Sequence, residues 1–258
     1  MRERPIDRAN RVALAKTRVN LSLCYQATGP WDKATAFHDQ AEENLARMAH
    51  DDPQDAESLR GLASLRINWC EGLIFNGKAD AALTEIDKNL GPLEDMHRRE
   101  PNLVEIRGLL GYSHGVRAKA IDAQHRPADA LADWERLIAL SDPEKQLELR
   151  GTLVNLLNDA KDYTRALAEA EAIVAELPQD ATPELTLFFA RAAAGGLAQL
   201  SKNDDRADRI ADVTLRLLEA ARARSGPGVW PGLAKSLDDE KVWTPLREQS
   251  RFKELSIH

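Results

Sequence analysis

The sequence predicts an all-α protein built from a series of antiparallel helix pairs, and three observations lead to this prediction. Alanine and leucine, which are strong helix formers, dominate a composition in which aromatic residues make up only 5%. Runs of β-branched residues bounded by turn residues, the usual signal of strands, are absent from the sequence. A small residue also returns at the same place after each of five polar turns, which indicates an internal repeat.

The repeat is clearest in the alanines that follow the turns. Each turn ends one apolar helical stretch and opens another. The alanines are Ala34, Ala82, Ala130, Ala166 and Ala207, at steps of 48, 48, 36 and 41 residues. Twelve residues before them stand Ser22, Cys70, Ala118, Val154 and Gly195. Antiparallel helices joined by a short turn approach most closely beside it, so small residues at these positions predict close packing of the two helices.

Local chemistry sets the helix boundaries. The stretch 141–144, Ser-Asp-Pro-Glu, has the form of a capping box with proline in the first helical turn, and Thr182-Pro183 repeats the use of proline. The expected helix pairs are 7–28 with 31–50, 55–76 with 79–99, 103–124 with 127–140, 143–160 with 163–177, and 183–201 with 205–224.

The sequence changes character after residue 224. The stretch 225–232 is rich in glycine and proline, which predicts a loop. The tail that follows carries the apolar residues Trp243, Leu246, Phe252 and Leu255. Because the end of a helical repeat array needs a cap over its last apolar face, we expect these side chains to fold back onto the last helix pair. Residues 225–258 are therefore expected to form a loop and a C-terminal cap.

The pattern resembles the tetratricopeptide repeat, a 34-residue unit with a small residue on its first helix, a glycine at the turn, an alanine early in its second helix and a proline at its end. The matching residues are Ser22, Gly29 and Ala34, then Cys70, Gly77 and Ala82, then Ala118 and Ala130, and then Tyr163, Ala166 and Pro178. The resemblance implies a right-handed α-solenoid of about five helix pairs over residues 1–224, in units 7–53, 54–101, 102–142, 143–178 and 182–224. The first two units are longer than the family norm, and His125, Lys161 and Lys202 replace the turn glycine.

Over nearly its full length the chain is also similar to the C-terminal repeat region of planctomycete-type serine/threonine protein kinases. In that region, turns like the stretch 126–131, Arg-Pro-Ala-Asp-Ala-Leu, precede a tail like the stretch 245–255. The kinase motifs His-Arg-Asp and Asp-Phe-Gly are absent from the sequence, so the resemblance implies no catalytic residue. It implies, as an alternative function, a regulatory repeat module of, or acting with, a bacterial serine/threonine protein kinase.

Composition and spacing argue against several classes of function. The net charge is −7 and no dense basic patch stands out, so nucleic acid is not an expected partner. The sequence holds no run of about 18 uncharged apolar residues that would span a membrane. Cys24 and Cys70 fit no zinc spacing and are expected to be reduced thiols of a cytoplasmic protein.

No cofactor or metal ion is expected either. His38 and Glu42 share a helix face, but a metal site needs three or four converging ligands, and local spacing supplies no complete set. Because no catalytic constellation is visible, we expect a protein that is not an enzyme. An α-solenoid enzyme with an unrecognised site is the remaining alternative.

The expected function is a non-catalytic scaffold or adaptor that binds a protein or peptide partner on its concave face. The first helices of stacked pairs line that face. Steps of three and four along these helices give five candidate residues: Tyr112, Lys119, Asn155, Asn158 and Phe189. Asparagine can both donate to and accept from a peptide backbone, and aromatic side chains anchor apolar groups in interfaces.

The first two units carry an apolar face that includes Ile67, Ile74 and Phe75. Large apolar patches on a surface mark interaction sites. We therefore expect a docking face here, for a partner or for a second copy of the chain, which would form a homodimer through the N-terminal repeats.

Overall fold

The computed structural model describes every residue except 1–4, 53–54, 202–203, 227 and 257–258, and within these described residues all regular secondary structure is helical. The chain divides into two compact units, Met1–Ser141 and Asp142–His258. The all-α prediction is confirmed. The predicted boundary between the first two repeats, at residues 53–54, and the start of the fifth turn, at residues 202–203, lie outside the described residues.

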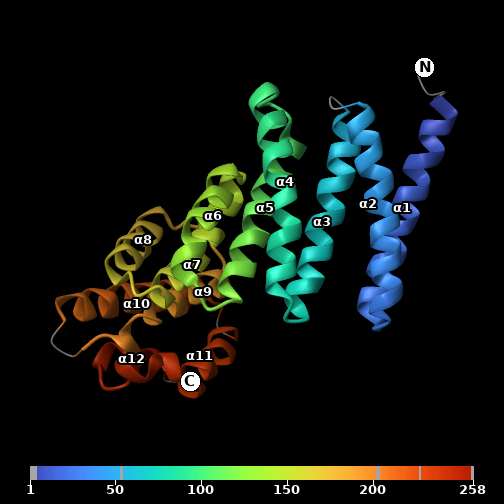
Figure 1. Cartoon of the computed structure of the whole chain (residues 1–258). Helices are drawn as coiled ribbons and strands as arrows, with labels where there is room; N and C mark the ends of the chain where they lie inside the picture. Colours follow the sequence, from blue (N-terminus) through green and yellow to red (C-terminus); the bar gives the residue numbers. More distant parts are fainter. Residues whose placement is uncertain (1–4, 53–54, 202–203, 227, 257–258) are drawn as a thin grey trace. The chain divides into compact units, whose positions relative to one another are not determined.

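Unit 1 holds three helix pairs (Figure 1). Its helices are α1 Pro5–Thr28, α2 Trp31–Asp51, α3 Ala56–Phe75, α4 Ala79–Arg99, α5 Val104–Asp122 and α6 Pro127–Leu140. Each helix packs against the next one along the chain. In addition, α3 contacts both α1 and α5, so the first helices of the three pairs lie next to one another.

Unit 2 holds two further helix pairs and a C-terminal segment. Its helices are α7 Pro143–Asp159, α8 Tyr163–Glu176, α9 Pro183–Ala194, η1 Leu197–Gln199, α10 Asp205–Arg224, α11 Trp230–Asp239, η2 Lys241–Leu246 and α12 Ser250–Leu255. The short helix η2 packs against α9 and η1, and α12 packs against α10. The four apolar side chains expected to fold back are all buried, at 0% exposure for Trp243 and Leu246, 3% for Phe252 and 4% for Leu255.

The ten predicted repeat helices begin and end within two residues of the observed ones, with one exception. The ninth was expected to continue to residue 201 but ends at Ala194, before a single turn of 3₁₀ helix. The side chain of Asn158 comes so close to Gly196 that a Cβ there would lie 2.8 Å from its Oδ1. This close approach is possible because Gly195 and Gly196, where the helix is interrupted, have no side chains.

The predicted loop 225–232 is also shorter than expected, because α11 already begins at Trp230. Pro231 stands in the first turn of this helix, where a missing backbone N–H costs nothing. The indole of Trp230 is buried, and its Nε1 donates a hydrogen bond to the carbonyl oxygen of Leu255 at 3.1 Å. The start of α11 is thereby joined to the end of the chain's last helix.

The same packing contact is found inside each of two helix pairs of unit 1. Ser22 Oγ donates to the carbonyl oxygen of Ala34 at 3.0 Å, and Cys70 Sγ donates to that of Ala82 at 3.3 Å. All four residues are at most 1% exposed. The same small-residue contact therefore recurs at equivalent positions of consecutive pairs, as the sequence spacing predicts.

We predict that the two thiols differ sharply in reactivity. Burial, with a smaller contribution from the charge of Glu85, raises the pKa of Cys70 to about 12, so its reactive thiolate form is scarce at neutral pH. Cys24 is exposed. Iodoacetamide followed by mass spectrometry should modify Cys24 alone in the native protein and both thiols after denaturation. Equal labelling of both thiols in the native protein would contradict this packing.

The first four turns between paired helices each contain a residue with a left-handed backbone. Gly29 and Gly77 have φ values of 104° and 71°, and His125 and Lys161 have values of 59° and 62°. The latter two therefore keep the conformation that glycine adopts in the first two turns. A side chain in this region is strained, so the later turns are held by the packing of the helices on either side.

We predict opposite effects for two glycine-to-alanine changes in unit 1. Gly77→Ala adds a Cβ in open space but at positive φ, so it should lower the free energy of unfolding by about 1 kcal/mol. Gly108→Ala also meets open space, inside α5, and should raise it by about 0.5 to 1 kcal/mol. Urea unfolding of both variants measures these changes. Destabilisation by both would show that steric crowding, and not backbone strain, determines the effect of the added methyl group.

Candidate functional site

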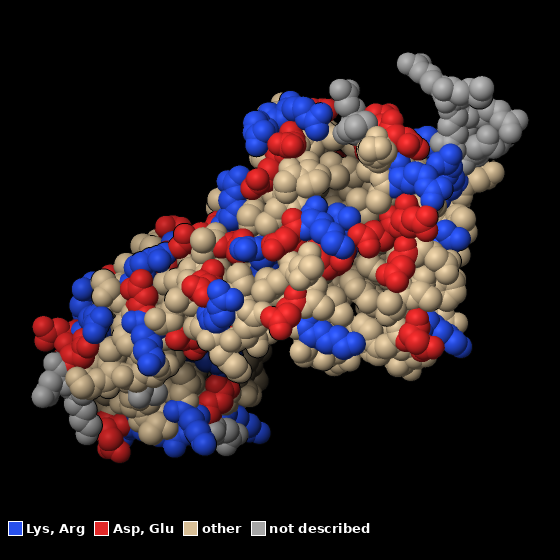
Figure 2. Space-filling view, viewed as in Figure 1, with Lys and Arg blue, Asp and Glu red and all other residues tan. Residues whose placement is uncertain are grey.

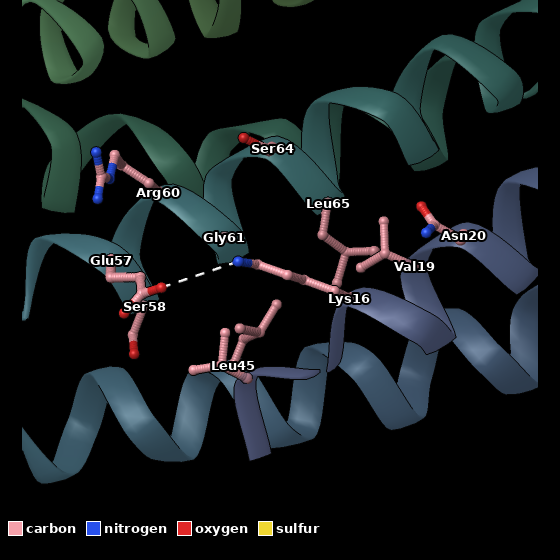
Figure 3. A pocket seen from close by; sticks show the side chains of 11 residues that line it. Lys16, Val19, Asn20, Leu45, Glu57, Ser58, Arg60, Gly61, Ser64 and Leu65 are labelled. Atoms are coloured by element: carbon pink, nitrogen blue, oxygen red, sulfur yellow. Dashed lines mark ion pairs between the residues drawn. The ribbon is translucent and has the colours of Figure 1, made fainter. Parts of the chain in front are cut away.

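A groove of about 450 Å³ lies between α1 and α3 in unit 1 (Figure 3). The lining residues are Val12, Lys16, Val19, Asn20, Leu45, Glu57, Ser58, Arg60, Gly61, Ser64 and Leu65. They come from α1, from α3 and, for Leu45 alone, from α2. Because α1 and α3 are the first helices of their pairs, the groove lies on the side of the molecule where first helices meet.

The floor of the groove is apolar. Leu45 and Leu65 are 5% and 2% exposed and belong to one core cluster with Ala15, against which Val19 packs half-buried. A Cβ on Gly61 would lie 3.1 Å from Cδ2 of Leu45, so the absence of a side chain there lets Leu45 reach the floor. The floor is therefore a continuation of the hydrophobic core, made of side chains that are packed in place.

Two cations stand at the rim of the groove. Lys16 Nζ lies 3.9 Å from Glu57 Oε1, with the lysine side chain extending from α1 toward α3 (Figure 3). Arg60 Nη1 lies 3.7 Å from Glu105 Oε1. Long ion pairs between exposed side chains contribute at most about 1 kcal/mol, so either cation can turn toward an incoming carboxylate at little cost.

The two walls of the groove are joined by Asp55. It caps the start of α3 by accepting a hydrogen bond from the backbone N–H of Glu57 at 3.2 Å, and it also accepts from Ser58 Oγ and, from α1, from Arg8 Nη2. Burial would raise the pKa of Asp55, but the hydrogen bonds from Ser58 and Arg8 and the charge of Arg8 hold this pKa below its usual value.

We predict that Asp55→Asn makes the stability of the protein less dependent on pH. Asparagine caps a helix as well as aspartate does but cannot pair with Arg8, so the unfolding free energy should fall by about 0.5 to 1 kcal/mol at neutral pH. A carboxylate with a lowered pKa in the folded state stabilises it above its unfolded pKa, and this contribution disappears as the pH falls through the folded pKa. The difference should therefore begin to shrink as the pH approaches 3.8, the usual pKa of this group, and vanish below the lowered pKa of the folded state.

Urea titrations of both proteins at a series of pH values provide the measurement. Asp55→Ala, which removes the cap as well, should lose about 1 kcal/mol more at every pH. A difference between the wild type and Asp55→Asn that stays constant from pH 7 to pH 3 would contradict the Arg8–Asp55 pairing.

Three of the five residues predicted for the concave binding face are accessible to a partner. Tyr112 on α5 is 54% exposed. Lys119, also on α5, is exposed and lies 3.4 Å from the carboxylate of Glu71. Asn155 on α7 is half-buried. Tyr112 and Lys119 belong to unit 1 and Asn155 to unit 2, and none of the three lines the groove between α1 and α3.

The other two residues predicted for the concave binding face are buried inside unit 2. Asn158 is 3% exposed and donates from Nδ2 to the carbonyl oxygen of Ala192 at 2.9 Å. Phe189 is 1% exposed and lies over Gly151, where a Cβ would stand 2.7 Å from its ring. Both side chains hold α7 against α9, so we remove them from the candidate site. The physical reason is that the face expected to be open is covered by the neighbouring helix pair.

The predicted docking face divides in a similar way. Ile67 and Ile74 are half-buried and pack against a core cluster that includes Trp69 and Cys70. Phe75, at the end of α3, is 90% exposed. The two isoleucines therefore contribute to the core of unit 1, and Phe75 is the member of this set that offers apolar surface.

Sequence reasoning missed the groove itself. Val12, Lys16 and Val19 are spaced by four and three residues, which places them on one face of α1, and this signal was available. Residue spacing could not predict that α3 leaves room beside that face, because the gap between α1 and α3 depends on how both helices pack on α2.

Apart from the groove, a cluster of polar side chains lies between α2, α3 and α4. One ligand atom each from His38, Glu42 and Glu85 lies within 4.8 Å of the others, an arrangement that could hold a metal ion. Arg66 Nη2 lies 2.8 Å from Glu42 Oε1, and Lys88 Nζ lies 2.6 Å from Glu85 Oε2. Burial would raise the pKa of Glu42, but Arg66, with smaller contributions from Lys88 and His38, lowers it overall.

Charges of both signs cover the face of the molecule shown in Figure 2, where Lys and Arg side chains stand among Asp and Glu side chains. Ion pairs between neighbouring helices include Arg209 with Glu171 and Arg251 with Asp212. On this face, recognition of a partner would therefore depend on local groups and not on a broad field of one sign.

Comparison with known proteins adds no family assignment. No protein-family model matches the chain, and a search of curated proteins finds no significant relative. Within the part of the chain that the structure describes, each helix is too short or too polar to traverse a lipid bilayer.

Proposed function

We propose that the protein is a non-catalytic adaptor whose groove between α1 and α3 binds a peptide segment of another protein. The observation that carries the proposal is the combination of an apolar floor, made by Leu45, Leu65 and Val19, with two loosely paired cations at the rim. This combination fits a short segment in which apolar side chains stand next to an aspartate or a glutamate.

The size and lining of the groove support this occupant. Its volume, about 450 Å³, lies in the range of about 300 to 1,000 Å³ that is typical of ligand sites. The floor offers the hydrophobic contact, and Asn20 and Ser64 add polar groups that can bond to a peptide backbone.

We further propose that the helix pairs form a right-handed solenoid of the tetratricopeptide type. Support comes from the repeated contact of Ser22 with Ala34 and of Cys70 with Ala82. The recurrent positive φ in the turns adds to it. In such an array the first helices line one continuous face, which is where the groove between α1 and α3 would belong.

We predict that a random 12-residue peptide library selected on the full chain yields sequences in which apolar residues adjoin Asp or Glu. Synthetic peptides from this selection should bind at least about tenfold more weakly to a Lys16→Glu, Arg60→Glu variant, which reverses both rim charges, a loss of about 1.4 kcal/mol. Val19→Asp, which puts a charge on the apolar floor, should cause a similar loss. Fluorescence anisotropy measures both affinities.

The matched control is Leu14→Asp, which places the same new charge on an exposed residue of the same helix outside the groove. It should bind the selected peptides as the wild type does. Wild-type affinity in both groove variants would exclude this groove as the peptide site, and selection of peptides without an acidic residue would exclude the proposed role of the rim cations.

A further inference from the structure

The polar cluster between α2, α3 and α4 contains buried polar atoms that make no hydrogen bond. His38 is 2% exposed, and its Nε2 atom has no hydrogen-bond partner. Glu85 Oε1 is buried without a hydrogen bond as well, although it lies within ion-pair distance of Arg66 Nε, at 3.3 Å. A buried polar atom left unsatisfied costs about 1–3 kcal/mol, so such atoms are rare and call for a physical reason.

The histidine ring is held in a fixed orientation. Its face stacks on Trp69 of α3 with ring centroids 4.3 Å apart, and its Nδ1 lies 3.2 Å from Asp39 Oδ1. Metal-binding histidines commonly donate one ring N–H to a carboxylate in this way, which leaves the lone pair of the other nitrogen for the metal. In His38 the nitrogen left for the cluster is therefore Nε2, the atom without a partner.

Two carboxylates meet the histidine. Glu42 lies one helical turn after it on α2, and Glu85 comes from α4, with side chains 20% and 13% exposed. One ligand atom from each of the three residues lies within 4.8 Å of the other two. Ligand atoms around a tetrahedral zinc ion stand about 3.4 Å apart, given bonds of about 2.0–2.2 Å. Small rotations of the two glutamates would be enough to close the site.

The two cations of the cluster differ in how firmly they are held. Arg66 is 11% exposed, contacts Glu42 and lies 3.3 Å from Glu85 Oε1. It also donates to the backbone carbonyl of Lys88 at 3.3 Å, so it is fixed in place. Lys88 is 45% exposed and on a flexible stem. Its ammonium, 2.6 Å from Glu85 Oε2, can leave for solvent when another cation arrives.

We propose that His38, Glu42 and Glu85 bind a divalent transition-metal ion of the zinc class, with the ion taking the place of the Lys88 ammonium. One imidazole nitrogen and two carboxylate oxygens suit such ions, and three protein ligands leave a coordination position for water. The bound ion joins α2 to α4 across α3 and thereby stabilises unit 1. This proposal is independent of the peptide groove.

The test measures Zn²⁺ binding to the full chain, prepared without a histidine tag, by isothermal titration calorimetry. The wild type should bind about one ion, and Co²⁺ in its place should give a visible absorption band from nitrogen and oxygen ligands. His38→Gln and Glu85→Gln should each weaken binding by more than about 100-fold, because even the loss of an outer partner of a ligand costs about 10- to 100-fold. Lys88→Gln should bind more tightly than the wild type.

Control variants on the same helix separate this site from adventitious surface binding. His50→Gln and Glu43→Gln change exposed residues of α2 and should leave the affinity unchanged. Circular dichroism establishes that each variant is as helical as the wild type. Zn²⁺ binding that is absent in the wild type, or that is unchanged in His38→Gln and Glu85→Gln, overturns the proposal. Affinity of Lys88→Gln equal to or below that of the wild type overturns the displacement of the ammonium.

Discussion

Close approach of paired helices at small buried residues is the constraint on which the rest of unit 1 depends. The side chains of Ser22 and Cys70 bond to the backbone of Ala34 and Ala82, so only one small side chain lies between the two helices of a pair at this point. Because α1 and α3 are each fixed in this way to the helix that follows, their mutual position is set by how the pairs stack. The groove between α1 and α3 is a consequence of that stacking.

Unit 1 also has hydrogen-bonded polar side chains in its interior. Asn89 donates to the carbonyl oxygen of Ala63 at 3.1 Å and lies 3.3 Å from Ser113 Oγ. Arg66 joins the same region to Glu42. Buried polar groups restrict the relative positions of helices more strictly than apolar contacts do, because a shift leaves them unsatisfied. The register of α3, α4 and α5 is thus determined by hydrogen bonds as well as by packing.

The two proposed sites share α2 but use different chemistry. Leu45 of α2 closes the floor of the groove, and His38 and Glu42 of the same helix face the polar cluster. Because α2 contributes to both, its position between α1 and α3 matters for peptide recognition and for metal binding alike. A helix that is packed on both sides in this way is a rigid support, as functional sites require.

The sequence by itself determined the helical class and, to within two residues, the ends of nine of the ten repeat helices. These features follow from local chemistry, such as Pro143 in a first turn and Gly77 at a positive φ. Only the tertiary structure decided that Asn158 and Phe189 are buried and that Glu85 meets His38 and Glu42. The reason is physical: spacing fixes which residues share a face of one helix, but the neighbouring helices decide whether that face is covered, open or completed by a residue from elsewhere.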